Sequence, residues 1–161
     1  MEKENKVSPV SWIMEWAGTK KIYYVISIIM ALFSVLFKIA PYFIIGDVIA
    51  KLLDGEDDIK VYAVRVGLVA AAFVLSEIFH SISTTLSHIA TFQVLANIRR
   101  KCLDKLTRVP LGYVKDTSSG TFKNIIVERI DSIETTLAHI LPEFTSNLVA
   151  PVIVIIYLFM I

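Results

Sequence analysis

The chain has 161 residues, of which 55% are hydrophobic and 19% are charged, and its formal net charge at pH 7 is +1. About a quarter of the residues of a soluble domain are charged, so this composition excludes an ordinary soluble domain, and the small net charge gives no general attraction to nucleic acid. The single cysteine, Cys102, excludes an internal disulfide and a four-cysteine zinc site. We therefore expect an integral membrane protein.

Residues 1–20 precede the first apolar run and predict an interfacial elbow helix. Trp12 and Trp16 stand close to Lys20 and Lys21, and tryptophan favours the headgroup zone of a membrane. A short helix lying on the membrane surface fits this pattern, and a frayed terminus is the alternative. No cleavable signal peptide is expected, because the apolar run that follows is too long for a signal core and has no small-residue cleavage site after it.

Two apolar helices joined by a short turn come next. The first covers about 21–53, where Pro41 is expected to cause a kink, and the second covers about 61–109. The acidic external turn at 54–60 is too short to hold a domain. At about 1.5 Å per residue the second helix is longer than the ~30 Å hydrocarbon core requires, so its end should project into water.

A third helix is predicted at about 119–161, after a stop signal at Pro110 and Gly112. Its apolar residues recur at close to 3.6 residues, as in an amphipathic helix that returns to the membrane. The segment 97–129 is basic and the external turn is acidic, so we expect that segment and the N-terminus to be cytoplasmic. The last residues lie within an apolar run, which indicates a fragment that ends inside a span.

The residues on both sides of Pro110 form a recurring pattern. An arginine lies on the second membrane helix, a Lys-Leu pair precedes the proline, and a Ser-Gly pair is followed by Arg-Ile-Asp. The pattern resembles the first intracellular loop of ATP-binding cassette (ABC) exporters. The residues that carry the resemblance are Ile98, Arg99, Arg100, Leu103, Lys105, Leu106, Pro110 to Tyr113, Ser119, Gly120, Phe122, Arg129, Ile130, Asp131 and Ile133.

The resemblance covers the whole chain and implies part of a type 1 exporter transmembrane bundle, all-α, with long transmembrane helices that extend into the cytoplasm. A coupling helix at about 110–117 would dock on a nucleotide-binding domain, carried on the same or a separate chain. Leu111 and Tyr113 would fill the groove of that domain, and a second exporter half would complete a homo- or heterodimer. From the residues alone, an ordinary turn between two helices with an exposed tyrosine is the alternative, because Pro-Leu-Gly-Tyr is also common in turns. The coupling-helix residues would be Pro110, Leu111, Gly112, Tyr113, Val114, Lys115 and Asp116.

The phosphate-binding motif Gly-x-x-x-x-Gly-Lys-Ser/Thr does not occur in the 161 residues. We therefore expect no catalytic residue, no ATP-binding domain and no cofactor in this fragment, with ATP and Mg²⁺ bound by the full-length protein. The resemblance implies ATP-driven export across the cell membrane of a substrate that it does not define. Two alternatives are a two-span membrane sensor with a cytoplasmic helical relay and an inactive membrane scaffold.

The second helix carries a polar stripe at helical spacing, formed by Glu77, His80, Thr84, His88 and Thr91. Lipid disfavours such side chains, so the stripe should face protein or a water-filled cavity. Lining of a translocation path and polar contact with another span are both open. The Glu-x-x-His spacing at its start is used by di-iron bundles, but no second copy is present, so we expect no metal site.

The register of the first two helices predicts two ion pairs inside the membrane. If the external turn is centred at 56–57, residues at equal distance on either side of it share a depth. This places Lys38 near Glu77 and Asp47 near Arg65. An unpaired charge at these depths would cost at least ~2.5 kcal/mol, so we expect a salt bridge in each pair. For Lys38, extension to the headgroups or contact with substrate is the alternative.

Overall fold

The computed structural model describes residues 9–160 and, among them, every side chain except those of Pro9, Val10, Trp12, Tyr113, Leu141, Leu158 and Met160. The expectations for residues 1–8 and for the side chain of Trp12 lie outside this part. The described residues form helices and no strand: α1 (Pro9–Ala17), the 3₁₀ turn η1 (Gly18–Lys20), α2 (Lys21–Leu53), α3 (Ile59–Thr107), α4 (Leu111–Asp116), α5 (Ser119–Lys123), the π-helical η2 (Asn124–Glu128) and α6 (Arg129–Met160).

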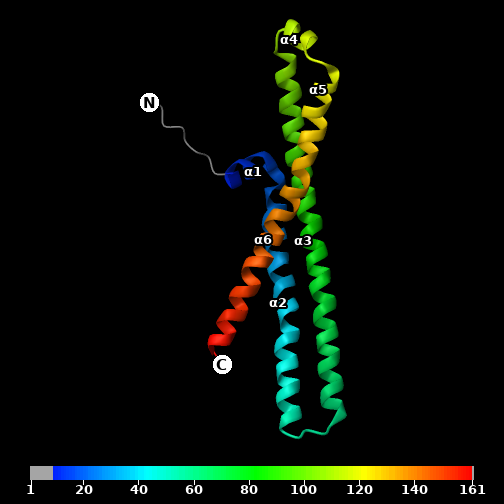
Figure 1. The fold of residues 1–161 in the computed structure, drawn as a ribbon, viewed down its shortest axis with the longest axis vertical. Coiled ribbons are helices and arrows are strands. Elements are labelled where there is room, and N and C mark those ends of the chain that lie inside the picture. Colours follow the sequence, from blue (N-terminus) through cyan, green and yellow to red (C-terminus); the bar gives the residue numbers. More distant parts are fainter. Residues whose placement is uncertain (1–8, 161) are drawn as a thin grey trace, which may run out of the picture.

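Helices α2 and α3 form a long antiparallel hairpin (Figure 1). Gly55 has φ 79° in the turn, a left-handed conformation that glycine adopts without steric cost. Asp58 caps α3, its Oδ1 accepting a hydrogen bond from the Lys60 backbone N–H at 2.9 Å. The observed α2 has the bounds expected from the sequence, whereas α3 begins and ends two residues earlier than expected.

A row of buried hydroxyl groups joins α2 to α3, and we call it the hydroxyl seam. Ser27 Oγ donates to the Ser83 carbonyl at 2.8 Å, and Ser83 Oγ donates to the Ser27 carbonyl at 2.7 Å. Ser76 Oγ donates to the Ser34 carbonyl at 3.1 Å. Small residues let helix backbones approach closely within a membrane, and their hydroxyls find partners across the contact. The seam therefore fixes the register of the hairpin.

Helix α6 crosses α2 and α3 obliquely (Figure 1). Leu137 and Ala138 are buried at this crossing, and Ser87 Oγ on α3 donates to the Ala138 carbonyl at 2.6 Å. Farther along α6, the ring of Tyr157 contacts that of Phe43 on α2, with centroids 4.3 Å apart. The segment expected as one continuous third helix thus comprises α5, the π-helical η2 and α6.

The N-terminal helix α1 packs against α3. Asn97 Nδ2 donates to the Trp16 carbonyl at 2.6 Å, and Lys101 Nζ lies 4.0 Å from the centre of a Trp16 ring. Such a cation–π contact holds the two elements together. This accounts for the position of α1 relative to α3, while its predicted place on the membrane surface stays a prediction.

Within residues 9–160, three helical segments are long and apolar enough to cross a membrane, namely Ile13–Leu53, Ile59–Thr107 and Ser119–Tyr157. A two-span sensor would lack the third. Many large apolar side chains along them are exposed, including Leu53 at 84% and Phe144 at 65%. An apolar surface of this extent is typical of helices that face lipid or other membrane helices.

Candidate functional site

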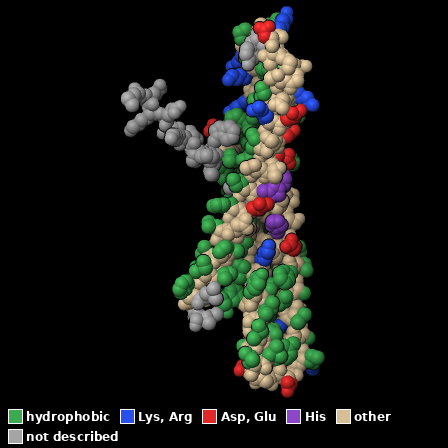
Figure 2. All heavy atoms as spheres, in the orientation of Figure 1, with side chains coloured by type: hydrophobic (Ala, Val, Ile, Leu, Met, Phe, Trp, Pro, Cys, Tyr) green, Lys and Arg blue, Asp and Glu red, His purple; other side chains and the backbone are tan. Residues whose placement is uncertain are grey.

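A polar groove runs along α3 on the side where α6 crosses it. Figure 2 shows histidine, acidic and basic side chains gathered over this crossing, between apolar surfaces on α2, α3 and α6. The α3 side chains that line it include Glu77, His80, Thr84 and His88, and Glu134 of α6 faces them. Four residues of the predicted stripe therefore lie together along one opening.

The fifth stripe residue, Thr91, does not line the groove. Its side chain is fully buried, and its Oγ1 lies 2.8 Å from the Tyr24 hydroxyl on α2 in a hydrogen bond. A buried tyrosine hydroxyl needs a polar partner, and Thr91 supplies one. The expectation that Thr91 lines a cavity is corrected: it belongs to the contact between α2 and α3.

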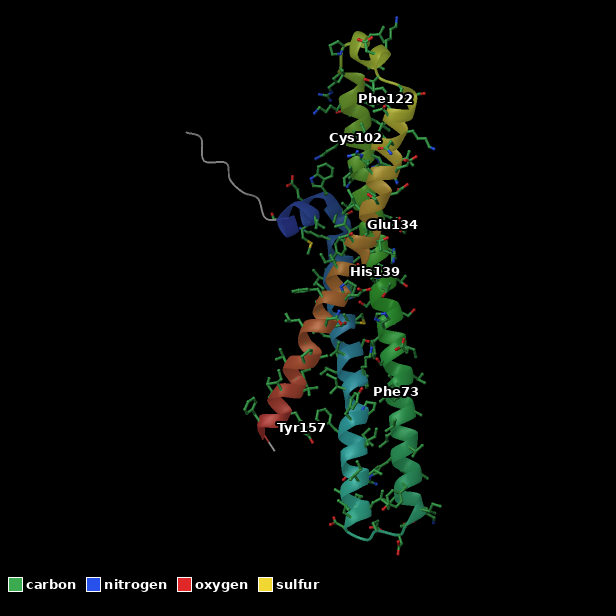
Figure 3. The ribbon with its side chains drawn as sticks, in the orientation of Figure 1. Phe73, Cys102, Phe122, Glu134, His139 and Tyr157 are labelled. Atoms are coloured by element: carbon green, nitrogen blue, oxygen red, sulfur yellow. The ribbon has the colours of Figure 1, made fainter. Side chains whose placement is uncertain are left out.

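Helix α6 brings titratable side chains into and beside the groove that were not expected there from the sequence. His88 Nδ1 lies 3.7 Å from Glu134 Oε1, and His139 Nδ1 lies 3.0 Å from Glu143 Oε1. The rings of His88 and His139 meet edge to face, with centroids 5.3 Å apart. Figure 3 shows Glu134 and His139 on α6 near its crossing with α3. The i,i+4 pair His139 and Glu143 within an apolar run was the available signal.

The two predicted ion pairs have different outcomes. Arg65 Nε lies 2.6 Å from Asp47 Oδ2, and Arg65 Nη1 also donates to the Val61 carbonyl at 3.0 Å. Lys38 and Glu77 line the same cavity of about 190 Å³, but among the described residues no salt bridge within 4.0 Å joins them. The expected Lys38–Glu77 ion pair is therefore not formed. The two residues lie at a similar depth and line one cavity, but their charged groups are more than 4.0 Å apart.

The groove does not have the geometry of a metal site. Within residues 9–160, no three described His, Cys, Asp or Glu side chains converge closely enough to hold a metal ion. The Glu-x-x-His motif at Glu77 and His80 lines a cavity together with a lysine. A cationic lysine is the wrong neighbour for a metal ion. The chemistry that the groove offers is charge pairing and hydrogen bonding.

The predicted coupling segment lies at the far tip of the molecule (Figure 1). Pro110 precedes α4 with φ −55° and ψ 139°, an extended conformation that ends α3 and starts the next helix. Leu111 is 68% exposed and Val114 is half-buried. The backbone of Tyr113 lies within α4, but its side chain is outside the described residues. Gly112, Lys115 and Asp116 are exposed.

The long helices that lead to this tip contact each other between the groove and α4. Arg99 on α3 forms a salt bridge with Asp131 on α6, and both residues belong to the pattern around Pro110. Phe122 and Ile126 line an apolar pocket with Leu106 of α3; Figure 3 places Cys102 and Phe122 at this end of the molecule. The two helices that carry α4 are thus joined by charge and by apolar contact.

Comparison with known families decides what this architecture is. A family model described as ABC transporter transmembrane region matches residues 24–161. The chain belongs to this family. Membership implies a membrane setting for this ABC transmembrane region. The described part of the chain, which is helical and has three apolar segments long enough to span a membrane, agrees with it.

The curated relatives are mycobactin import ATP-binding/permease proteins IrtA. The one from Mycolicibacterium smegmatis is 25% identical over 138 residues, which is 85% of this chain and 16% of the relative. The Mycobacterium tuberculosis protein is 26% identical over 144 residues, or 88% of this chain and 16% of the relative. This ABC transmembrane region therefore spans about a sixth of the length of the curated relatives that it matches.

Proposed function

We propose that this ABC transmembrane region is the membrane part of an ATP-driven transporter, in which α4 receives the motion of a nucleotide-binding domain. The observation that supports this is the placement of α4: its exposed Leu111 lies at the tip of the molecule, and the polar groove lies farther along, at the middle of α3 and the first turns of α6 (Figure 1). Cargo would pass along the groove, lined by Glu77, His80, Thr84 and His88.

Stiff helices supply the link between the tip and the groove. The salt bridge between Arg99 and Asp131 ties α3 to α6 along the projecting part. A displacement at Leu111 would then move both helices together instead of bending the loop between them. Two-state lever motions of packed helices are a recurrent mechanism of switching proteins. The groove opens at the α3–α6 crossing, so such a motion would change its access.

The charge distribution sets the orientation in this proposal. Eight Lys and Arg residues lie between 97 and 129, and the turn after α2 carries Asp54, Glu56, Asp57 and Asp58. Basic residues mark the cytoplasmic side, so α4 and the N-terminus are cytoplasmic and the acidic turn is external. The nucleotide-binding domain would bind ATP and Mg²⁺, and a second half, identical or different, would complete the pathway in the cell membrane.

The direction of transport across the membrane is also part of the proposal. The loop around Pro110 resembles that of exporters, and export follows from this resemblance. The relatives are named for mycobactin import. Their identity to this chain is 25–26% over a sixth of their length, so the direction of transport is tested by experiment. In sealed vesicles, ATP supplied on the cytoplasmic face drives cargo away from that face in export and toward it in import.

The test uses the full-length protein in lipid nanodiscs, with Cys102 and any other accessible cysteine replaced by serine and Thr84→Cys introduced as the labelling site. ATP with vanadate should change the maleimide labelling of this groove position. Leu111→Ala with Tyr113→Ala should reduce that change about fivefold or more, within the usual range of coupling between sites, while ATP hydrolysis continues. Leu103→Ala, at an exposed leucine on the α3 shaft, is the matched control. An unchanged labelling response in the double variant contradicts the proposal.

A further inference from the structure

A small polar cavity lies where α2, α3 and α6 meet, at one end of the groove. Its volume is about 190 Å³, and seven of its eight lining residues are polar, which makes it unlike the apolar surfaces around it. The charged and amide groups come from all three helices: Lys38 from α2, Glu77 and His80 from α3, and Glu143 and Asn147 from α6. Intramembrane convergence of this kind indicates a binding function.

Two opposite charges in the cavity lack a direct partner. Glu143 contacts His139 at 3.0 Å, whereas no salt bridge within 4.0 Å reaches Lys38 or Glu77 from any described residue. Both side chains are exposed within the described part of the chain, and an isolated charge at this depth of a membrane is costly unless an opposite charge and hydrogen bonds compensate it. At about 30 Å³ per water molecule the cavity has room for roughly six waters, or for a small ligand that carries both charges.

An apolar groove continues from this cavity between α2 and α6. Its volume is about 370 Å³, and it shares Val35, Lys38, Ser146 and Asn147 with the polar cavity. The residues that it adds are mostly apolar: Ile39, Tyr42, Ala150, Pro151 and Val154. The two spaces together form an amphipathic site, with the polar part where α2, α3 and α6 meet and the apolar part between α2 and α6.

We propose that this site binds an amphiphile with a zwitterionic head, as the cargo class of the proposed transporter. The ammonium group of the head faces Glu77, its phosphate or carboxylate faces Lys38, and its hydrocarbon tail lies in the groove between α2 and α6. A zwitterion satisfies both unpaired charges and brings no net charge into the membrane. A cationic head would leave Lys38 unpaired, and an anionic head would leave Glu77 unpaired.

The test measures binding without ATP, so that it does not depend on coupling through α4. The full-length protein in phosphatidylglycerol nanodiscs is titrated with three probes that share a hexyl tail: hexylphosphocholine, hexyltrimethylammonium and hexyl phosphate. The shift in thermal unfolding reports binding. Hexylphosphocholine should bind about tenfold more tightly than either singly charged probe, equivalent to one unpaired charge at about 1.4 kcal/mol.

Variants then assign the two charges. Lys38→Gln should move the preference toward hexyltrimethylammonium, and Glu77→Gln should move it toward hexyl phosphate. Lys60→Gln and Glu56→Gln, at exposed positions of the external turn, are charge-matched controls and should keep the wild-type preference. Equal binding of the three probes, or the same preference in both cavity variants, overturns the proposal.

The source of the zwitterion is a further arm of the experiment. Nanodiscs that contain phosphatidylethanolamine should weaken hexylphosphocholine binding if the natural occupant is a bilayer lipid, and should leave it unchanged if the occupant comes from water. Both results agree with the proposal that the head of the bound amphiphile is zwitterionic. If Leu111→Ala with Tyr113→Ala fails to uncouple while the head preference follows Lys38 and Glu77, the coupling proposal fails and the binding site remains.

Discussion

Helix α3 presents polar side chains in two different settings. Toward α2, Ser76 and Ser83 are buried, and each hydroxyl bonds to a carbonyl across the contact. Toward the groove, Glu77 is exposed and has no salt bridge among the described residues, and His88 is half-buried beside Glu134. In the first setting the helices are closely packed and every named hydroxyl has a hydrogen-bond partner. In the second setting there is open volume between the charged side chains.

The difference teaches how one membrane helix can serve structure and function at once. Small hydroxyl residues allow close contact between helices, and their hydroxyl groups form hydrogen bonds across that contact. They therefore stabilise a fixed register. Charged residues cannot pack in this way, and the space that they hold open can admit water or a ligand. We therefore expect substitutions in the hydroxyl seam to change stability and substitutions in the groove to change function.

The largest effect is expected from a bulky residue in the hydroxyl seam. Ser83→Leu would force apart α2 and α3, because the Ser83 side chain is fully buried; we expect a loss of about 2–3 kcal/mol, as for other overpacked cores. Ser81→Leu is the matched control, since Ser81 is two residues away and exposed. Unfolding of the full-length protein in detergent measures both. Equal losses in the two variants would show that the seam is no more tightly packed than the groove.

A smaller effect is expected when only the hydrogen bonds of the seam are removed. Ser27 and Ser83 exchange two hydroxyl-to-carbonyl bonds, at 2.8 and 2.7 Å. Because hydrogen bonds between membrane helices contribute about 0.6–1.7 kcal/mol, Ser27→Ala and Ser83→Ala should each destabilise by about that amount. A double-mutant cycle should give a coupling of similar size. Additive losses would mean that the serines act through their small size alone.

Local signals explain what the sequence predicted well. Apolar length, the acidic turn and the Pro110 stop are readable from neighbouring residues, and the observed α2, α3 and α4 bounds lie within two residues of the expected ones. The pair Asp47 and Arg65 forms because it is close to the turn, where the register of a hairpin has little room to drift. The ABC family, identified from the loop pattern, is confirmed.

The remaining features depend on rotation of helices about their axes, which no local signal determines. Hairpin register placed Lys38 and Glu77 at one depth, but the cavity between them depends on where α6 crosses. The same crossing brings the ring of His139 against that of His88, and Glu143 to the polar cavity. The hydroxyl seam was missed although a signal was present: Ser27 and Ser34 are seven residues apart, as are Ser76 and Ser83, the spacing of a packed helix seam.

The smallest effect on stability is expected for a charge in the groove. Glu134 Oε1 lies 3.7 Å from His88 Nδ1, and the two side chains are 33% and 31% exposed. Partly exposed pairs of this kind contribute about 0–1 kcal/mol, so Glu134→Gln should change the free energy of unfolding by less than about 0.5 kcal/mol. Its effect should appear in the ATP-dependent labelling of Thr84→Cys, which reports on the groove directly. A loss of stability as large as that of Ser83→Ala would show that the groove charges hold α6 against α3, and the contrast between the two settings would then fail.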